Sequence, residues 1–61
     1  MSKIKKGSVI REYKYGYCIQ STVITDPIKN ERGQLEFKAE TRIGSIIDYI
    51  KNESSLEIVK E

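Results

Sequence analysis

One stretch decides the fold, Gln34-Leu35-Glu36-Phe37-Lys38-Ala39-Glu40-Thr41-Arg42, in which apolar or small side chains alternate with charged or amide ones. Successive side chains of a β-strand point to opposite faces of the sheet, so the stretch predicts a strand with one buried and one solvated face. Strands of parallel sheets are covered on both faces and are apolar throughout. We therefore expect an antiparallel sheet, with Leu35 and Phe37 in its core.

Other short segments also have the composition of β-strands. Residues that are β-branched or aromatic predict strands over 9–13, 17–25 and 56–60. In the second of these, alternate residues would share one face: Tyr17, Ile19, Ser21, Val23 and Thr25.

Turn residues separate the predicted strands. The Asp26-Pro27 pair and Gly33 bound a loop over 26–33, because Asp-Pro initiates turns and glycine closes them. Gly16 and Gly44 mark tight connections. Residues 1–7 are polar and basic and are expected to form a short frayed lead-in.

Segment 45–53 is compatible with two secondary structures. Ser45 and Asp48 have the spacing of a helix capping box, and Ile46, Ile47 and Ile50 could line one helical face. However, the segment is short and β-branched, and isolated helices under about 12 residues are marginal. A strand over 45–51 and a turn over 52–55 are therefore favoured over a helix.

Five short antiparallel strands in 61 residues predict a single all-β domain, either a small barrel or a strongly bent sheet. The opening Lys6-Gly7-Ser8-Val9-Ile10-Arg11, the Tyr- and Gly-rich turn after it and the long second strand resemble the start of SH3-like barrels, including the KOW and Tudor types. The resemblance implies a five-stranded SH3-like barrel. A KOW unit would carry a Gly-rich basic segment after its first strand, where this chain has only Gly16. The Lys- and Ile-rich sequence is also similar in style to small accessory proteins of large tailed phages.

The composition excludes several kinds of functional site. The chain has no histidine and one cysteine, so it can form neither an internal disulfide nor a zinc site of the usual Cys/His type. Catalytic arrangements that need histidine cannot be built. The four glycines are scattered, so the chain has no phosphate-binding loop. We expect no enzyme activity, no catalytic or metal-binding residue and no cofactor.

The cysteine content and the start of the chain bear on the compartment. A single cysteine, Cys18, fits a reducing environment. The basic start is followed by no apolar run typical of a signal peptide, and no stretch approaches the ~20 apolar residues of a membrane span. We expect a cytoplasmic protein without membrane contact. Cys18 itself is expected to be a small buried or half-buried thiol.

Three tyrosines recur every second residue near the start of the chain. Two of them could pack in the core, or the group could form an interface, where tyrosine is enriched. A regular strand would place all three on one face, whereas a turn at Gly16 would splay them. The predicted partner-binding residues are these tyrosines and the basic residues beside them: Tyr13, Tyr15, Tyr17, Arg11 and Lys14.

These observations favour a non-catalytic protein-binding module, for example a phage-encoded inhibitor or modulator of a host or defence protein. The alternative is a nucleic-acid-binding barrel that contacts phosphates through its basic residues and stacks bases on Tyr15 or Tyr17. Residues 1–14 hold five basic residues against one acid, a net charge of +4. The predicted phosphate contacts are Lys3, Lys5, Lys6, Arg11 and Lys14.

Charge separates the two hypotheses. The isoelectric point is 8.8, whereas dedicated nucleic-acid domains tend to exceed about 9. The strand at 34–42 also presents acids beside bases. The protein-binding hypothesis is therefore favoured. A homodimer is as plausible as a monomer, because small proteins without disulfides or metals often gain stability from a second subunit.

Overall fold

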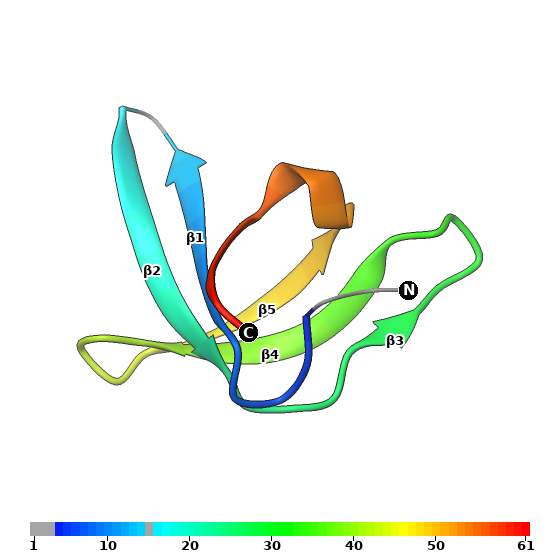
Figure 1. Ribbon diagram of the computed structural model, residues 1–61, viewed down its shortest axis with the longest axis horizontal. Helices are drawn as coiled ribbons and strands as arrows, with labels where there is room; N and C mark the ends of the chain where they lie inside the picture. Colours follow the sequence, from blue (N-terminus) through cyan, green and yellow to red (C-terminus); the bar gives the residue numbers. More distant parts are fainter. Residues whose placement is uncertain (1–3, 15) are drawn as a thin grey trace.

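The computed structural model describes residues 4–14 and 16–61, with Lys14 described by its backbone alone. The chain is all-β, as predicted, and forms one curled antiparallel sheet with the shape of a half-barrel (Figure 1). A 3-10 turn, η1 (Glu53–Ser55), lies between the last two strands. The strands are β1 (Val9–Lys14), β2 (Tyr17–Val23), β3 (Ile28–Lys29), β4 (Leu35–Thr41), β5 (Ile46–Lys51) and β6 (Glu57–Lys60).

The last strand returns to pair with the first. β1 lies between β2 and β6, and β4 pairs with both β2 and β5. The curl brings distant strands together across the concave face. There, Lys51 Nζ lies 3.2 Å from Glu12 Oε2, and the hydroxyls of Ser21 and Tyr49 share a hydrogen bond of 3.3 Å.

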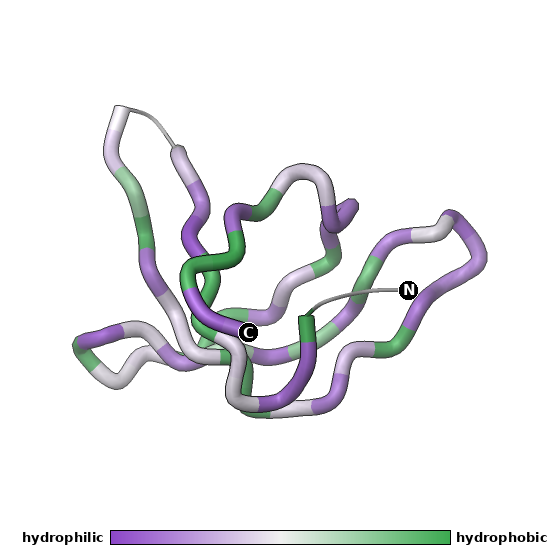
Figure 2. Tube along the Cα trace, in the orientation of Figure 1, coloured by the Kyte–Doolittle hydropathy of each residue, from purple (hydrophilic) through white to green (hydrophobic). Residues whose placement is uncertain are grey.

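The predicted register of the deciding strand is confirmed. Leu35, Phe37 and Ala39 are buried, while Glu36 and Lys38 between them are exposed. Figure 2 shows this alternation as successive hydrophobic and hydrophilic segments along β4. The concave face of the sheet carries the core, whose members are Ile4, Ile10, Val23, Leu35, Phe37, Ala39, Tyr49 and Leu56.

Segment 45–53 is a strand and a turn, as favoured from the sequence. Ser45 belongs to the β4–β5 hairpin and caps no helix, since its N–H is bonded to Thr41 Oγ1 at 3.1 Å and its carbonyl accepts from Thr41 N–H at 2.8 Å. Gly44 has φ +87° and donates to the Thr41 carbonyl. This is the three-residue loop with a left-handed third residue that suits antiparallel strands.

The predicted number of five strands is wrong, because the expected loop 26–33 contains the short strand β3. The side chain of Asn30 stabilises the turn between β3 and β4. Asn30 Oδ1 accepts from the N–H groups of Arg32 and Gln34, and its Nδ2 donates to Glu36 Oε2 at 3.0 Å. These bonds close a turn that holds β3 antiparallel to the start of β4.

The predicted frayed lead-in is also wrong for the residues that the structure describes. Ile4 is only 4% exposed and belongs to the core. Ser8 is buried, and its Oγ accepts from Lys5 N–H at 3.0 Å. The backbone of residues 7 and 8 bonds to that of Val23 in both directions at 2.8 Å. A tight turn therefore delivers Ile4 to the core.

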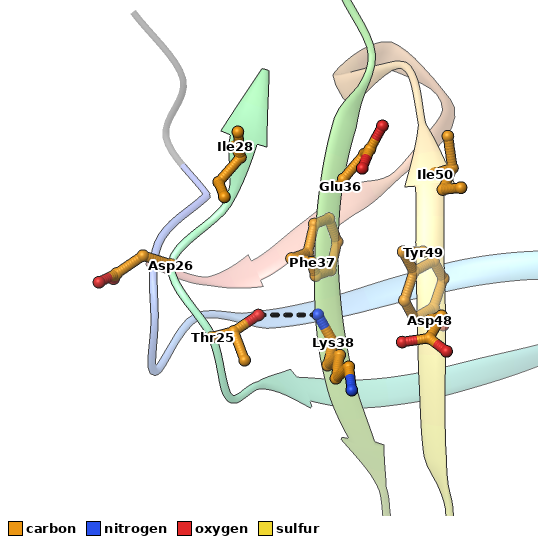
Figure 3. A pocket seen from close by; sticks show the side chains of 9 residues that line it. All are labelled: Thr25, Asp26, Ile28, Glu36, Phe37, Lys38, Asp48, Tyr49 and Ile50. Atoms are coloured by element: carbon orange, nitrogen blue, oxygen red, sulfur yellow. Dashed lines mark hydrogen bonds between the residues drawn. The ribbon is translucent and has the colours of Figure 1, made fainter. Parts of the chain in front are cut away.

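β2 ends at Val23, two residues earlier than predicted. Thr25 leaves the strand and accepts a hydrogen bond of 2.9 Å from Lys38 N–H, drawn in Figure 3. Within the described part of the chain, no helix has the length and hydropathy needed to cross a membrane.

Candidate functional site

The β1–β2 hairpin carries the predicted tyrosines and projects beyond the rest of the sheet (Figure 1). Directly paired residues of antiparallel strands share a face. Ile10 and Ser21 are paired and buried, so Tyr17 extends their concave face, while Tyr13 lies on the convex face opposite Cys18.

The tyrosines are thus splayed, as a turn at Gly16 predicts. Tyr13 is 68% exposed and Tyr17 is 57% exposed, so neither packs in the core. The core-packing alternative is wrong for both. Tyr15 lies outside the described residues.

Arg11 lies on the same face as Tyr13 and is held by its neighbours. Its Nη1 is 3.4 Å from Glu57 Oε1 on β6, and its Nη2 donates to Gln20 Oε1 at 3.4 Å. A hydrogen bond with Tyr13 raises the pKa of Arg11 above its ordinary value, against the opposing effect of partial desolvation, and the Glu57 carboxylate raises it further. The guanidinium is thereby positioned beside the exposed tyrosine ring.

We call this convex surface, formed by Arg11, Tyr13, Cys18 and Gln20, the hairpin patch. The expectation of a buried or half-buried Cys18 is wrong, because its side chain is exposed. β4 pairs with β2 only over 21–23, so residues 17–20 lie beyond the neighbouring strand. Strand alternation alone does not reveal where a neighbouring strand ends.

The predicted phosphate-binding residues are only partly placed. Lys5 and Lys6 are exposed in the turn before β1, and Arg11 lies within β1 against the Glu57 carboxylate. Lys3 and the side chain of Lys14 lie outside the described residues. The described members therefore occupy two separate positions, one of which is already paired with an acid.

A second surface, which the sequence analysis missed, is a groove of about 430 Å³ on the convex face of β3, β4 and β5 (Figure 3). Ile28 and Ile50 stand on either side of Glu36, while Lys38 and Asp48 lie side by side below them. A signal was present in the sequence. β5 has apolar residues at both even and odd positions, so whichever face of the strand is buried, its solvent-exposed face must be partly apolar.

The two surfaces are described by the side chains that they present. Among residues 4–14 and 16–61, no group of three or more Cys, Asp or Glu side chains is placed to hold a metal ion. Aromatic, aliphatic and guanidinium groups lie at the hairpin patch and the groove, where they can contact another macromolecule.

Comparisons with protein-family models, characterised proteins and solved structures gave no match to the chain. No relative supplies a function or a set of site residues. The interpretation of both surfaces therefore depends on their own geometry.

Proposed function

We propose that the chain is a non-catalytic protein-binding module that contacts its partner through the hairpin patch. One observation supports this most directly: exposed Tyr13 stands beside Arg11, which is held in place by Glu57 and Gln20. Tyrosine and arginine dominate the energetically important positions of protein interfaces. An arginine that is already restrained loses less side-chain entropy when a partner binds.

The other predicted interface residues do not all lie on the same face of the hairpin as Tyr13. Tyr17 is exposed on the opposite face, so a partner that covers Tyr13 would reach Tyr17 only by wrapping the tip of the hairpin. Tyr15 and Lys14 are included in the proposed surface because they lie between Tyr13 and Tyr17 in the sequence.

An SH3-like barrel is the architecture we propose for this module. The curl of the antiparallel sheet and the return of β6 to β1 support it. The style of the sequence supports a phage-encoded inhibitor or modulator that acts in the cytoplasm on a host or defence protein.

Nucleic-acid binding is the weaker alternative. Arg11 is paired with a carboxylate, and the exposed residues of β4 alternate in charge from Glu36 to Lys38 to Glu40. A phosphate backbone would meet repulsion as well as attraction on such a surface.

Affinity capture with matched variants tests the proposal. Immobilised wild-type protein and the Tyr13→Ala and Lys29→Ala variants are incubated with an extract of the natural host, and bound proteins are identified by mass spectrometry. Lys29 is a suitable control because it is exposed on β3, away from the hairpin, and does not line the groove. We expect a protein that wild type and Lys29→Ala retain and Tyr13→Ala loses.

A titration with the captured protein then gives the size of the effect. Loss of a central tyrosine anchor costs about 2 kcal/mol or more, which is roughly a 30-fold weaker Kd. Equal capture by Tyr13→Ala would place the interface elsewhere. Nuclease-sensitive recovery that depends on Lys5 and Lys6 would favour nucleic acid instead.

A further inference from the structure

β5 leaves one of its edges without a partner. Among the described strands it pairs with β4 alone. Backbone groups of an antiparallel strand point alternately to its two edges. The backbone of Ser45 bonds to Thr41, so the backbone N–H and C=O groups of residues 47, 49 and 51 also point toward β4. Those of Ile46, Asp48 and Ile50 point to the free edge.

The free edges of the sheet differ in character. In the described part of the chain, β3 pairs with β4 alone and has only two residues. β6, at the other end of the sheet, has four residues, begins with Glu57, ends with Lys60 and shifts register against β1. Short length, charge and irregular pairing are the features that protect an edge from further pairing. β5 has six residues in an uninterrupted ladder, and Ile46 and Ile50 on its convex face are 53% and 56% exposed.

The pattern of β5 is symmetric about Asp48. Ile46 and Ile50 lie two residues to either side of Asp48 on the convex face, and apolar Ile47 and Tyr49 flank it on the concave face. If two copies pair antiparallel with a two-fold axis at Asp48, Ile46 lies opposite Ile50 of the partner subunit. The three residues of each copy whose backbone groups point to the free edge would then all form hydrogen-bonded pairs with the partner subunit.

Other registers fit less well. A slip by one residue would place convex side chains opposite concave ones. A slip by two residues would place an isoleucine opposite Asp48 and leave the second isoleucine without a partner. The symmetric register is therefore the one in which both isoleucines on the convex face of β5 are paired.

The lysine beside Asp48 offsets the one unfavourable contact of this register, which is between the two Asp48 carboxylates. The symmetric register brings two Asp48 carboxylates together at the axis, and like charges directly opposite are destabilising. Lys38 is the cross-strand partner of Asp48 on β4 and lies on the same convex face (Figure 3). Each copy thus brings one lysine with each aspartate, and the cluster at the axis is neutral.

We infer that the occupant of the free β5 edge is a second copy of this chain, paired antiparallel about Asp48 to give one continuous sheet. This contact is independent of the hairpin patch, because the patch lies on β1 and β2. It leaves Tyr13 of both copies available to partners.

Sedimentation velocity tests whether the dimer forms. Across micromolar to near-millimolar concentrations, the wild-type mass is expected to rise from 7.0 kDa toward twice that value. Asp48→Lys would gather four lysines at the axis and should abolish the rise. The swapped variant Asp48→Lys with Lys38→Glu should restore it. A wild-type mass that stays monomeric throughout would overturn the inference, as would a dimer that Asp48→Lys leaves intact.

Disulfide trapping tests the register. Hydrogen-bonded pairs have Cα atoms about 5.5 Å apart, within the range that a disulfide spans. In a Cys18→Ser background, Asp48→Cys should form a covalent dimer under mild oxidation. Ile43→Cys should form much less, although Ile43 is 90% exposed on the β4–β5 loop. Equal cross-linking of the two variants would refute pairing at Asp48. Circular dichroism spectra of all variants are recorded as a control, and each should show that the sheet is retained.

Discussion

Replacing Phe37 by alanine should remove most of the stability of the domain. Phe37 is 5% exposed, and its ring stacks on that of Tyr49 with centroids 5.2 Å apart and planes 15° apart. Truncation of a buried phenylalanine to alanine costs about 3–5 kcal/mol. A domain of 61 residues has a total stability of roughly 3–9 kcal/mol at the usual value per residue. At the middle of both ranges about 2 kcal/mol would remain, so the variant should be close to unfolding at room temperature, and unfolded if the total lies at the low end.

Thermal and urea unfolding followed by far-UV circular dichroism measure this effect, since the chain has no tryptophan. In a domain this small, 1 kcal/mol shifts Tm by about 4–8 °C, so the expected loss is roughly 12–40 °C. Glu40→Ala is the matched control, because Glu40 is exposed on the same strand and should change stability by no more than about 0.5 kcal/mol. A loss of less than about 5 °C for Phe37→Ala would contradict the assigned core.

Three further outcomes follow from particular contacts. Ile4→Ala should lower the free energy of unfolding by about 2–5 kcal/mol in a urea titration, whereas the Lys5→Ala, Lys6→Ala pair on the same exposed turn should be nearly neutral. Tyr49→Phe removes the hydroxyl bonded to buried Ser21 and should cost about 0.5–1.5 kcal/mol; an unchanged urea midpoint would mean that this bond contributes nothing. Exposed Cys18 should react stoichiometrically with a thiol reagent in the folded protein, and a reaction that requires denaturant would show that it is buried.

Much of the fold was predictable because the deciding information is local. The alternation from Leu35 to Thr41 indicates which side chains face the core, and Phe37 lies in the core as predicted. The β-branched composition of 46–50 predicted a strand despite the helix-capping pattern at Ser45. In both cases neighbouring residues along the chain carry the signal, and the structure only adds the pairing partners.

The candidate surfaces were less predictable. The sequence indicated that Tyr13 belongs to a strand next to a turn, and that Arg11 lies two residues away on the same face. It contained no sign that Glu57, 46 residues further along, would hold the guanidinium. The apolar groove arises because β3 and β5 flank β4 and place Ile28 and Ile50 on either side of Glu36.

By itself, then, the sequence determined the all-β class and the buried face of β4, because side-chain alternation is a property of consecutive residues. It favoured a strand for β5 through β-branched composition. Only the tertiary structure decided that Ile4 enters the core, that Cys18 lies beyond the cover of β4, and that β5 keeps a free edge. Each of these depends on which strands pair and where each strand ends relative to its neighbour. Those relations are set by contacts between residues far apart in the chain, and periodicity along one segment does not encode them.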